Sequence, residues 1–148
     1  GGPLERKLRT QVEQLGLSGI VVITGTVSQE ELVELYHQAH LFLLPLVPKI
    51  HWGIPNVLIE AMAARTPVIS CDLPSLKELV EHGKSGWIIP EQDPAAVALA
   101  VETLWKDPAL RDRMAEAGYR QVAQRFSLEE TGERLRGIFD EAVAARRP

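Results

Sequence analysis

The fold is decided by one stretch of the chain, Trp52-Gly53-Ile54-Pro55-Asn56-Val57-Leu58-Ile59-Glu60-Ala61-Met62-Ala63-Ala64. It joins a glycine-containing loop to a predicted helix in which Glu60 is the one charged residue. A helix that is apolar on nearly every side is expected to be buried. A buried carboxylate needs a partner, because burying an unpaired charge is costly. We therefore expect Glu60 to be held by another part of the protein or by a ligand.

The beginning of this helix has the features of an anion site. Asn56 is a residue type that caps helices well, and Gly53 leaves the backbone before the helix free to approach another group. The first N–H groups of a helix have no partner within the helix, so they can bind a negatively charged ligand. The stretch thus predicts a loop and helix that bind an anion.

The composition excludes several functional classes. The chain has 148 residues, of which 45% are hydrophobic and 24% charged, as in an ordinary globular domain. Its net charge of −4 gives no electrostatic support for binding nucleic acid or an anionic membrane. No apolar run is long enough to cross a bilayer. The single cysteine, Cys71, is expected to be a small buried residue, and the whole pattern predicts a cytoplasmic protein without a transmembrane segment.

Strand and helix signals alternate along the first part of the chain. Apolar runs predict strands at 20–23, 41–44, 68–70 and 87–89, and apolar spacing predicts a helix over 4–15 that ends at Gly16. The patterns Ser28-x-x-Glu31 and Ser75-x-x-Glu78 predict two capped helices between strands. Strands that are apolar on both faces are typical of a parallel sheet covered by helices. We expect an α/β, Rossmann-like, doubly wound parallel sheet with helices on both faces.

Three helices are expected after Pro90, where no further strand signal occurs. The pairs Asp93-Pro94 and Asp107-Pro108 each place a capping acid before a proline at the first helical position, and Ser127-x-x-Glu130 is a third capping box. Each helix has an apolar stripe. The stripe of the last one consists of Leu128, Leu135, Ile138, Phe139 and Ala142.

With its motifs in this order, the chain resembles the C-terminal, donor-binding domain of a known family, the family 4 (group 1) glycosyltransferases of GT-B fold. The resemblance rests on motifs in family order and spacing over nearly the whole chain, namely Gly2-Pro3-Leu4, Thr24-Gly25-Thr26-Val27-Ser28, Leu43-Leu44-Pro45, Gly53 through Ala63, Pro67-Val68-Ile69-Ser70, Glu78-Leu79-Val80-Glu81-His82-Gly83, Gly86-Trp87-Ile88-Ile89-Pro90, Asp93-Pro94 and Arg125-Phe126-Ser127. It implies that residues 1–148 are one nucleotide-sugar-binding domain. The Gly-Gly-Pro start suggests a fragment that lacks its first strand or strands and its N-terminal acceptor domain.

The resemblance also implies roles for particular residues. Glu60 corresponds to the second acid of the family's Glu-x7-Glu motif, which hydrogen-bonds the ribose hydroxyls of the donor. The backbone of Gly53, Ile54, Pro55, Asn56 and Val57 corresponds to the loop and helix start that hold the sugar and the diphosphate. Val27 lies where the family packs its backbone near the base. No catalytic residue is assigned, and neither a cofactor nor a bound metal is expected.

The chain departs from the family at the first acid of Glu-x7-Glu. That acid falls at position 52, which is Trp52 here, and residues 41–59 contain no carboxylate to replace it. Three explanations stay open: Lys49 or His51 supplies the sugar contact, the donor is unusual, or this copy is weakened. Trp52 either covers the loop or stacks on a sugar or base. A glycine pair common in the family is Pro74-Ser75 here, and the strand with the basic diphosphate-gripping residues is absent.

The function implied by the resemblance is sugar transfer. The intact protein is expected to be a retaining glycosyltransferase of hexosyl type that moves a sugar from a nucleotide-diphosphate donor to an acceptor hydroxyl, in polysaccharide or glycolipid synthesis. Its place would be the cytoplasm, or the cytoplasmic membrane face through the N-terminal domain. The isolated domain is expected to be inactive. Two alternatives remain: a catalytically degenerate nucleotide-binding or scaffolding module, and a sugar-nucleotide epimerase of the same fold.

Overall fold

The computed structural model describes residues 2–46 and 53–145, which belong to two compact units, residues 1–34 and 35–148. The first unit contains the helix α1 (Glu5–Gln14), whose cap Leu15 is followed by the predicted stop residue Gly16, where a positive φ of 67° suits glycine. Arg9 pairs with Glu5 one turn before it at 2.8 Å and also donates to the carbonyl of Ile23 at 3.2 Å. The prediction that residues 1–148 form one domain stays a prediction.

The predicted strand at 20–23 is wrong. These residues have no strand conformation in the structure, and Ile20 and Val22 are 79% and 81% exposed. A strand needs a neighbouring strand to accept and donate its backbone hydrogen bonds. The described residues of the first unit contain no strand that could pair with it. The β-branched run at 20–23 therefore stays irregular, because no described residue of its unit offers it a strand to pair with.

The helix α2 (Gln29–Gln38) begins with the predicted capping box. The Ser28 N–H donates to the Glu31 carboxylate at 2.8 Å, and the Glu31 N–H donates to the Ser28 hydroxyl at 3.2 Å. These reciprocal bonds satisfy two N–H groups at the helix start. The last turn of α2 belongs to the second unit, where Tyr36 is buried.

The second unit is built on a parallel sheet, as predicted. The strands β1 (Phe42–Leu44), β2 (Val68–Cys71) and β3 (Trp87–Ile89) pair in the order β1-β2-β3, with Phe42 opposite Val68 and Ile69 opposite Trp87. All residues of the central strand β2 are buried. In β1, at one edge of this sheet, Leu43 is 39% exposed, so this strand is less covered than its apolar sequence predicts.

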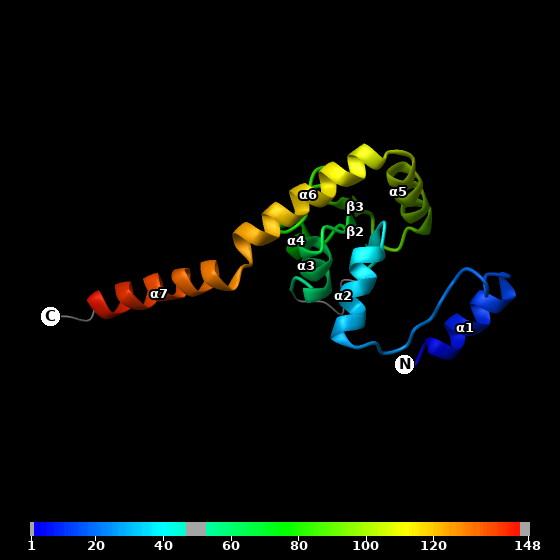
Figure 1. The fold of residues 1–148 in the computed structure, drawn as a ribbon, viewed down its shortest axis with the longest axis horizontal. Coiled ribbons are helices and arrows are strands. Elements are labelled where there is room, and N and C mark those ends of the chain that lie inside the picture. The colour runs from blue at the N-terminus through cyan, green and yellow to red at the C-terminus, as the bar shows by residue number, and fades with distance from the viewer. Residues whose placement is uncertain (1, 47–52, 146–148) are drawn as a thin grey trace. The chain divides into compact units, whose positions relative to one another are not determined.

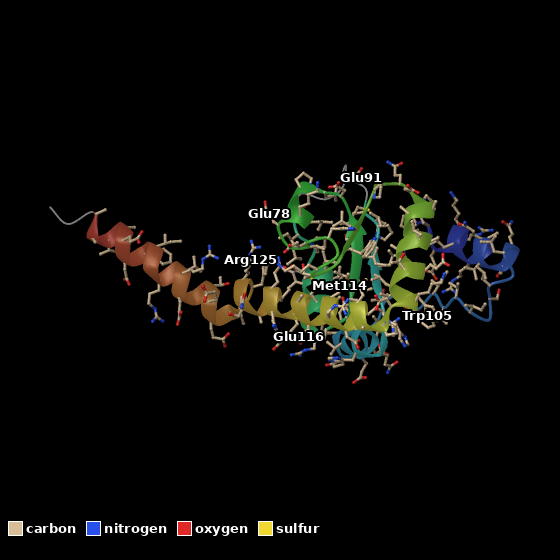
Figure 2. All side chains as sticks on the ribbon, turned by 90° about the horizontal axis from the view of Figure 1, so that it is seen from above. Glu78, Glu91, Trp105, Met114, Glu116 and Arg125 are labelled. Carbon is tan, nitrogen blue, oxygen red and sulfur yellow. The ribbon has the colours of Figure 1, made fainter. Side chains whose placement is uncertain are left out.

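Helices cover both faces of this sheet (Figure 1). The helix α3 (Asn56–Ala63) packs on β2 and on α6 (Pro108–Arg125), while α5 (Pro94–Lys106) packs on β3 and α6. The close approach of α6 to α3 depends on Gly118, where a Cβ atom would lie 3.3 Å from the Met62 side chain and 3.0 Å from the Ser85 carbonyl. Met114 of α6, labelled in Figure 2, is fully buried. The core thus lies between β2, α3 and α6.

The predicted caps of the last three helices are present. Asp93 and Asp107 each accept a backbone N–H at 2.9 Å at the starts of α5 and α6, and the Ser127 hydroxyl accepts the Glu130 N–H at 3.1 Å at the start of α7 (Leu128–Ala144). None of the α7 residues is buried.

The capping box predicted at Ser75 is wrong. The short helix α4 (Pro74–Lys77) begins two residues earlier than this box requires, with Leu73 and not Ser75 before its first residue, and it has no side-chain cap. Glu78 follows its last residue instead of standing in a first turn. The Glu78 carbonyl accepts a hydrogen bond from Arg125 at the end of α6, and Figure 2 labels both residues. Pro74 at the first helical position determines where this helix begins, because its fixed φ suits that position.

Candidate functional site

The carboxyl ends of the strands form one edge of the second unit. Ligands of open α/β sheets bind at this edge. A pocket of about 490 Å³ lies here, lined by residues at the ends of all three strands and the start of α5. Its walls are mostly apolar, and they include Pro45, Cys71, Ile89 and Val97. This edge therefore offers an apolar surface, and the polar groups of a binding site would have to come from the loops beside it.

The start of α3 differs from the prediction in a way that leaves its N–H groups open. Asn56 is not the N-cap; it is the first residue of the helix, and Pro55 precedes it with an extended backbone. Proline has no side-chain acceptor, so it cannot cap the helix. Among the described residues none accepts a hydrogen bond from the N–H groups of Asn56 and Val57. These donors are thus available to an anion.

The loop before α3 leaves space for a ligand. A Cβ atom at Gly53 would have no heavy atom of the described residues within 4 Å. Gly53 and Asn56 are exposed, and Ile54, Pro55 and Val57 are half-buried. The backbone between Gly53 and Val57 is therefore reachable from outside, as an anion site requires.

Glu60 has the partner that its sequence environment demands. The Tyr36 hydroxyl donates to Glu60 Oε2 at 3.2 Å, from the last turn of α2 to the second turn of α3. Glu60 itself is half-buried rather than fully buried, because α3 buries Leu58, Ala61 and Met62 and leaves its other side partly open. The second oxygen, Oε1, has no partner in the described part of the chain. Since no fully buried side-chain oxygen there lacks a partner, Oε1 is reachable from solvent.

The environment of Tyr36 keeps its hydroxyl protonated. Burial, and then the charge and hydrogen bond of Glu60, raise the pKa of Tyr36 from 10.0 to about 12. The hydroxyl is therefore a hydrogen-bond donor at neutral pH. The partner of Glu60 is thus a neutral group, and the carboxylate has no Lys or Arg paired with it among the described residues.

The remaining predicted site residues have different outcomes. His51 and Trp52, like Lys49, lie outside the described residues. Val27 is half-buried in the first unit, directly before the Ser28 cap, whereas Gly53 and Glu60 belong to the second unit. The contact of Val27 with a base therefore stays a prediction. The structure brings together the Gly53–Val57 backbone and Glu60 on one short helix and its entry loop.

Two polar side chains near the strand ends are already paired or buried. Asp72, directly after β2, is exposed and pairs with Lys77 at 2.6 Å. Cys71 is 1% exposed, as predicted, and burial raises the pKa of its thiol, although the Leu46 N–H donates to its sulfur at 3.2 Å. A buried thiol with a raised pKa is a poor nucleophile. Neither residue adds an obvious reactive group to the site.

The described residues contain neither a candidate metal site nor a candidate membrane span. Within residues 2–46 and 53–145, no three His, Cys, Asp or Glu side chains are grouped so that they could hold a metal ion. In the same residues, no helix has both the length and the apolar character needed to cross a membrane.

Comparison with known proteins decides the family. A model of the family described as glycosyl transferases group 1 matches residues 1–121. The chain belongs to the group 1 glycosyltransferases. It is 33% identical over 140 residues to an alpha-D-kanosaminyltransferase of Streptomyces kanamyceticus, which covers 95% of this chain and 36% of the relative. It is also 42% identical over 100 residues to a putative colanic acid biosynthesis glycosyltransferase of Salmonella typhimurium, over 66% of this chain and 25% of the relative. The chain therefore spans about a quarter to a third of the length of these curated relatives.

Solved structures place this group 1 glycosyltransferase chain in the GT-B fold. Sucrose-phosphate synthase from Thermosynechococcus elongatus matches with a TM-score of 0.84 and 27% identity over 97% of this chain and 35% of that one. An Anabaena protein solved with UDP-glucose matches with a TM-score of 0.81 and 22% identity over 92% of this chain and 36% of that one. The second likeness shows the fold alone. The predicted α/β sheet with helices on both faces is thus confirmed.

The residue of the candidate site that sequence reasoning missed in this glycosyltransferase chain is Tyr36, the partner of Glu60. The helical pattern placed it on the apolar face of α2, where a tyrosine is ordinarily a core residue. Two signals together could have found it. Glu60 needs a partner, and a buried tyrosine hydroxyl also needs one. Pairing them requires knowing that the last turn of α2 lies beside α3, and the tertiary structure supplies that fact.

Proposed function

We propose that this chain is the donor-binding half of a retaining glycosyltransferase, which moves a sugar from a nucleotide-diphosphate sugar to an acceptor hydroxyl. The observation that carries the proposal is the construction of α3. No described residue caps its first N–H groups, and one turn further along the Glu60 carboxylate presents a reachable oxygen. A diphosphate suits the N–H groups, and a ribose diol suits a carboxylate that can accept two hydroxyl protons. An N-terminal domain in the intact protein would bind the acceptor.

The helix start would contribute to the reaction as well as to binding. When the sugar leaves, negative charge develops on the diphosphate. Fixed N–H donors at a helix N-terminus stabilise such charge without reorganising, because the folded backbone already orients them. We expect the transfer to need no bound metal, so that activity of the intact protein persists in excess EDTA; loss of activity that Mg²⁺ or Mn²⁺ restores would contradict this expectation.

Nucleotide binding by the intact protein tests the proposal. Isothermal titration with UDP, GDP, ADP and their sugars should find at least one ligand, and UDP-glucose is the first to test because a protein of the same fold was solved with it. No binding to any of them would contradict the proposal. Glu60→Ala should weaken binding by about 1–3 kcal/mol, the value of a hydrogen bond to a charged group.

A matched control separates this effect from a general loss of a glutamate. Glu102 of α5 is an exposed residue whose partner is Lys106 on the same helix. Glu102→Ala should leave the dissociation constant unchanged. If Glu60→Ala also leaves it unchanged, Glu60 is not part of the nucleotide site.

The position of Trp52 favours testing a second function, a degenerate nucleotide-binding or scaffolding module. Trp52 stands where the family resemblance implies a sugar-binding acid. In the intact protein, normal turnover of the wild type would exclude this alternative. A strong gain of sugar transfer in Trp52→Glu from an inactive wild type would support it. Product analysis by NMR would separate transfer with retention from inversion and from epimerisation of the donor.

A further inference from the structure

The contact between Tyr36 and Glu60 has an unusual form for a half-buried carboxylate. Glu60 has no cation beside it in the described part of the chain, and its protein partner is a single hydroxyl, 3.2 Å from Oε2. A lysine or arginine partner would offset the charge of the carboxylate and compete with a ligand for its lone pairs. A tyrosine hydroxyl occupies one lone pair and leaves the negative charge in place. The remaining acceptor positions stay available.

Tyr36 is itself held in place by two further segments. Its backbone carbonyl accepts a hydrogen bond from the Thr66 hydroxyl at 2.7 Å, on the connection between α3 and β2. Its ring meets the ring of Phe42 in β1 edge-on, with the centroids 5.6 Å apart. The residue is only 4% exposed. The bond from Thr66 holds the backbone of Tyr36, and burial beside Phe42 restricts its ring, so its hydroxyl is held near Glu60.

A glutamate without such a partner would rotate about three side-chain bonds. Ordering it on ligand binding costs conformational entropy, which lowers affinity. A donor that already holds Oε2 removes most of this cost before the ligand arrives, and it aims Oε1 in one direction. We propose that Tyr36 is a positioning residue for nucleotide recognition, which holds the Glu60 carboxylate so that its free oxygen meets the ribose hydroxyls. The proposal rests on the proposed function, because it assumes that Glu60 binds ribose.

The protonation of Tyr36 is consistent with this role. A positioning donor must keep its proton wherever the enzyme works, and the pKa of Tyr36 is raised to about 12 by burial and by the nearby carboxylate. The hydroxyl therefore donates over the whole physiological pH range.

The experiment compares a nucleoside diphosphate with its 2′,3′-dideoxy analogue. The intact protein is titrated with UDP, GDP and ADP, and the tightest of them is compared with its dideoxy form in wild type, Tyr36→Phe, Glu60→Gln and the double variant. The quantity measured is the dissociation constant of the dideoxy form divided by that of the parent nucleotide. A purely structural defect weakens both ligands equally and leaves this ratio unchanged. A loss of ribose recognition lowers the ratio.

We expect the ratio to fall in Tyr36→Phe by roughly 3- to 10-fold, the range of one hydrogen bond. The ratio should fall at least as far in Glu60→Gln. In the double variant it should fall no further than in Glu60→Gln alone, because the Tyr36 hydroxyl acts through the carboxylate. Tyr119→Phe is the matched control, since Tyr119 is the other tyrosine of the chain and lies on α6 under Arg65. It should leave the ratio at the wild-type value.

The possible failures are distinct. If the ratio falls in Glu60→Gln but not in Tyr36→Phe, Tyr36 is a core residue and the positioning proposal is overturned, while ribose binding by Glu60 stands. If Tyr36→Phe lowers the ratio equally in the wild-type and Glu60→Gln backgrounds, the two residues act independently and the proposal is also overturned. A ratio that Glu60→Gln does not change, or no binding of any nucleotide, contradicts the proposed function itself.

Discussion

The helices α3 and α7 both have apolar sequences, but they have opposite environments. In α3, Leu58, Ala61 and Met62 are almost completely buried against β2 and α6. In α7, the stripe residues Leu128, Ile138 and Phe139 are 61–88% exposed. An apolar stripe therefore predicts that a helix forms and which side it will bury, but not whether a partner for that side is present. The partner comes from another part of the sequence or from another molecule.

The largest expected effect comes from truncating one leucine to alanine in each of the two helices. Leu58→Ala in α3 should lower the free energy of unfolding of the 148-residue chain by about 2–5 kcal/mol, because it leaves a cavity in a closed core. Leu135→Ala in α7 should change it by about 0.5 kcal/mol or less, since Leu135 is 49% exposed. Urea unfolding followed by circular dichroism measures both. Equal losses would mean that α7 is packed as tightly as α3.

A smaller effect should come from pH, through the contact that ties α3 to α2. The pKa of Tyr36 is raised in the folded chain from 10.0 to about 12, so Tyr36 loses its proton at lower pH when unfolded. The stabilisation is complete below pH 10 and is lost as the pH rises towards 12. Its size is about 2–3 kcal/mol, from a shift of about two pH units.

The matched variant isolates this contribution from other groups that titrate at high pH. Tyr36→Phe lacks the titrating group. The unfolding free energy of the wild type should therefore fall relative to that of the variant between pH 10 and 12. A difference that stays constant across this range would show that Tyr36 has an ordinary pKa and is not buried against Glu60.

A third test exchanges glycines for alanine in the two environments. At Gly118 of α6, a new methyl group would press on the Ser85 carbonyl and on Met62 of α3, so Gly118→Ala should destabilise the chain by about 1 kcal/mol in spite of alanine's better helix propensity. At Gly137 of α7, a Cβ would have no neighbour within 4 Å. Gly137→Ala should therefore stabilise by about 0.5–1 kcal/mol. Thermal unfolding measures the two signs, and the same sign at both positions would contradict the packing described.

Local signals were good predictors where the competing interactions are also local. The box Ser28-x-x-Glu31 closes as predicted, and Asp93, Asp107 and Ser127 cap the helices that follow them. The same pattern at Ser75 fails because the helix begins at Pro74, two residues earlier than a cap at Ser75 would place it. At α3, the cap predicted at Asn56 fails for a related reason, because the helix begins after Pro55. Proline offers no side-chain acceptor, and the first N–H groups of α3 in the candidate site therefore have no side-chain cap.

Pairing across the chain was harder to predict. The runs 20–23 and 68–70 are both short and β-branched, but Val68 and Ile69 lie between two neighbouring strands and are fully buried, whereas Ile20 and Val22 are exposed. Strand formation depends on backbone partners that lie far away in sequence. The predicted need of Glu60 for a partner was correct, and its identity as Tyr36, 24 residues earlier, required the folded structure.

The sequence by itself determined the alternation of strands and helices, most of the helix caps, the family and the segment that carries the candidate site. These features depend on residues within one turn or one motif of each other, so they can be predicted from the local sequence. Only the tertiary structure decided which apolar faces are covered, that the run at 20–23 pairs with no strand among the described residues, and that Tyr36 contacts Glu60. Those outcomes depend on which distant segments meet, and burial and hydrogen bonding act between whatever segments the fold brings together.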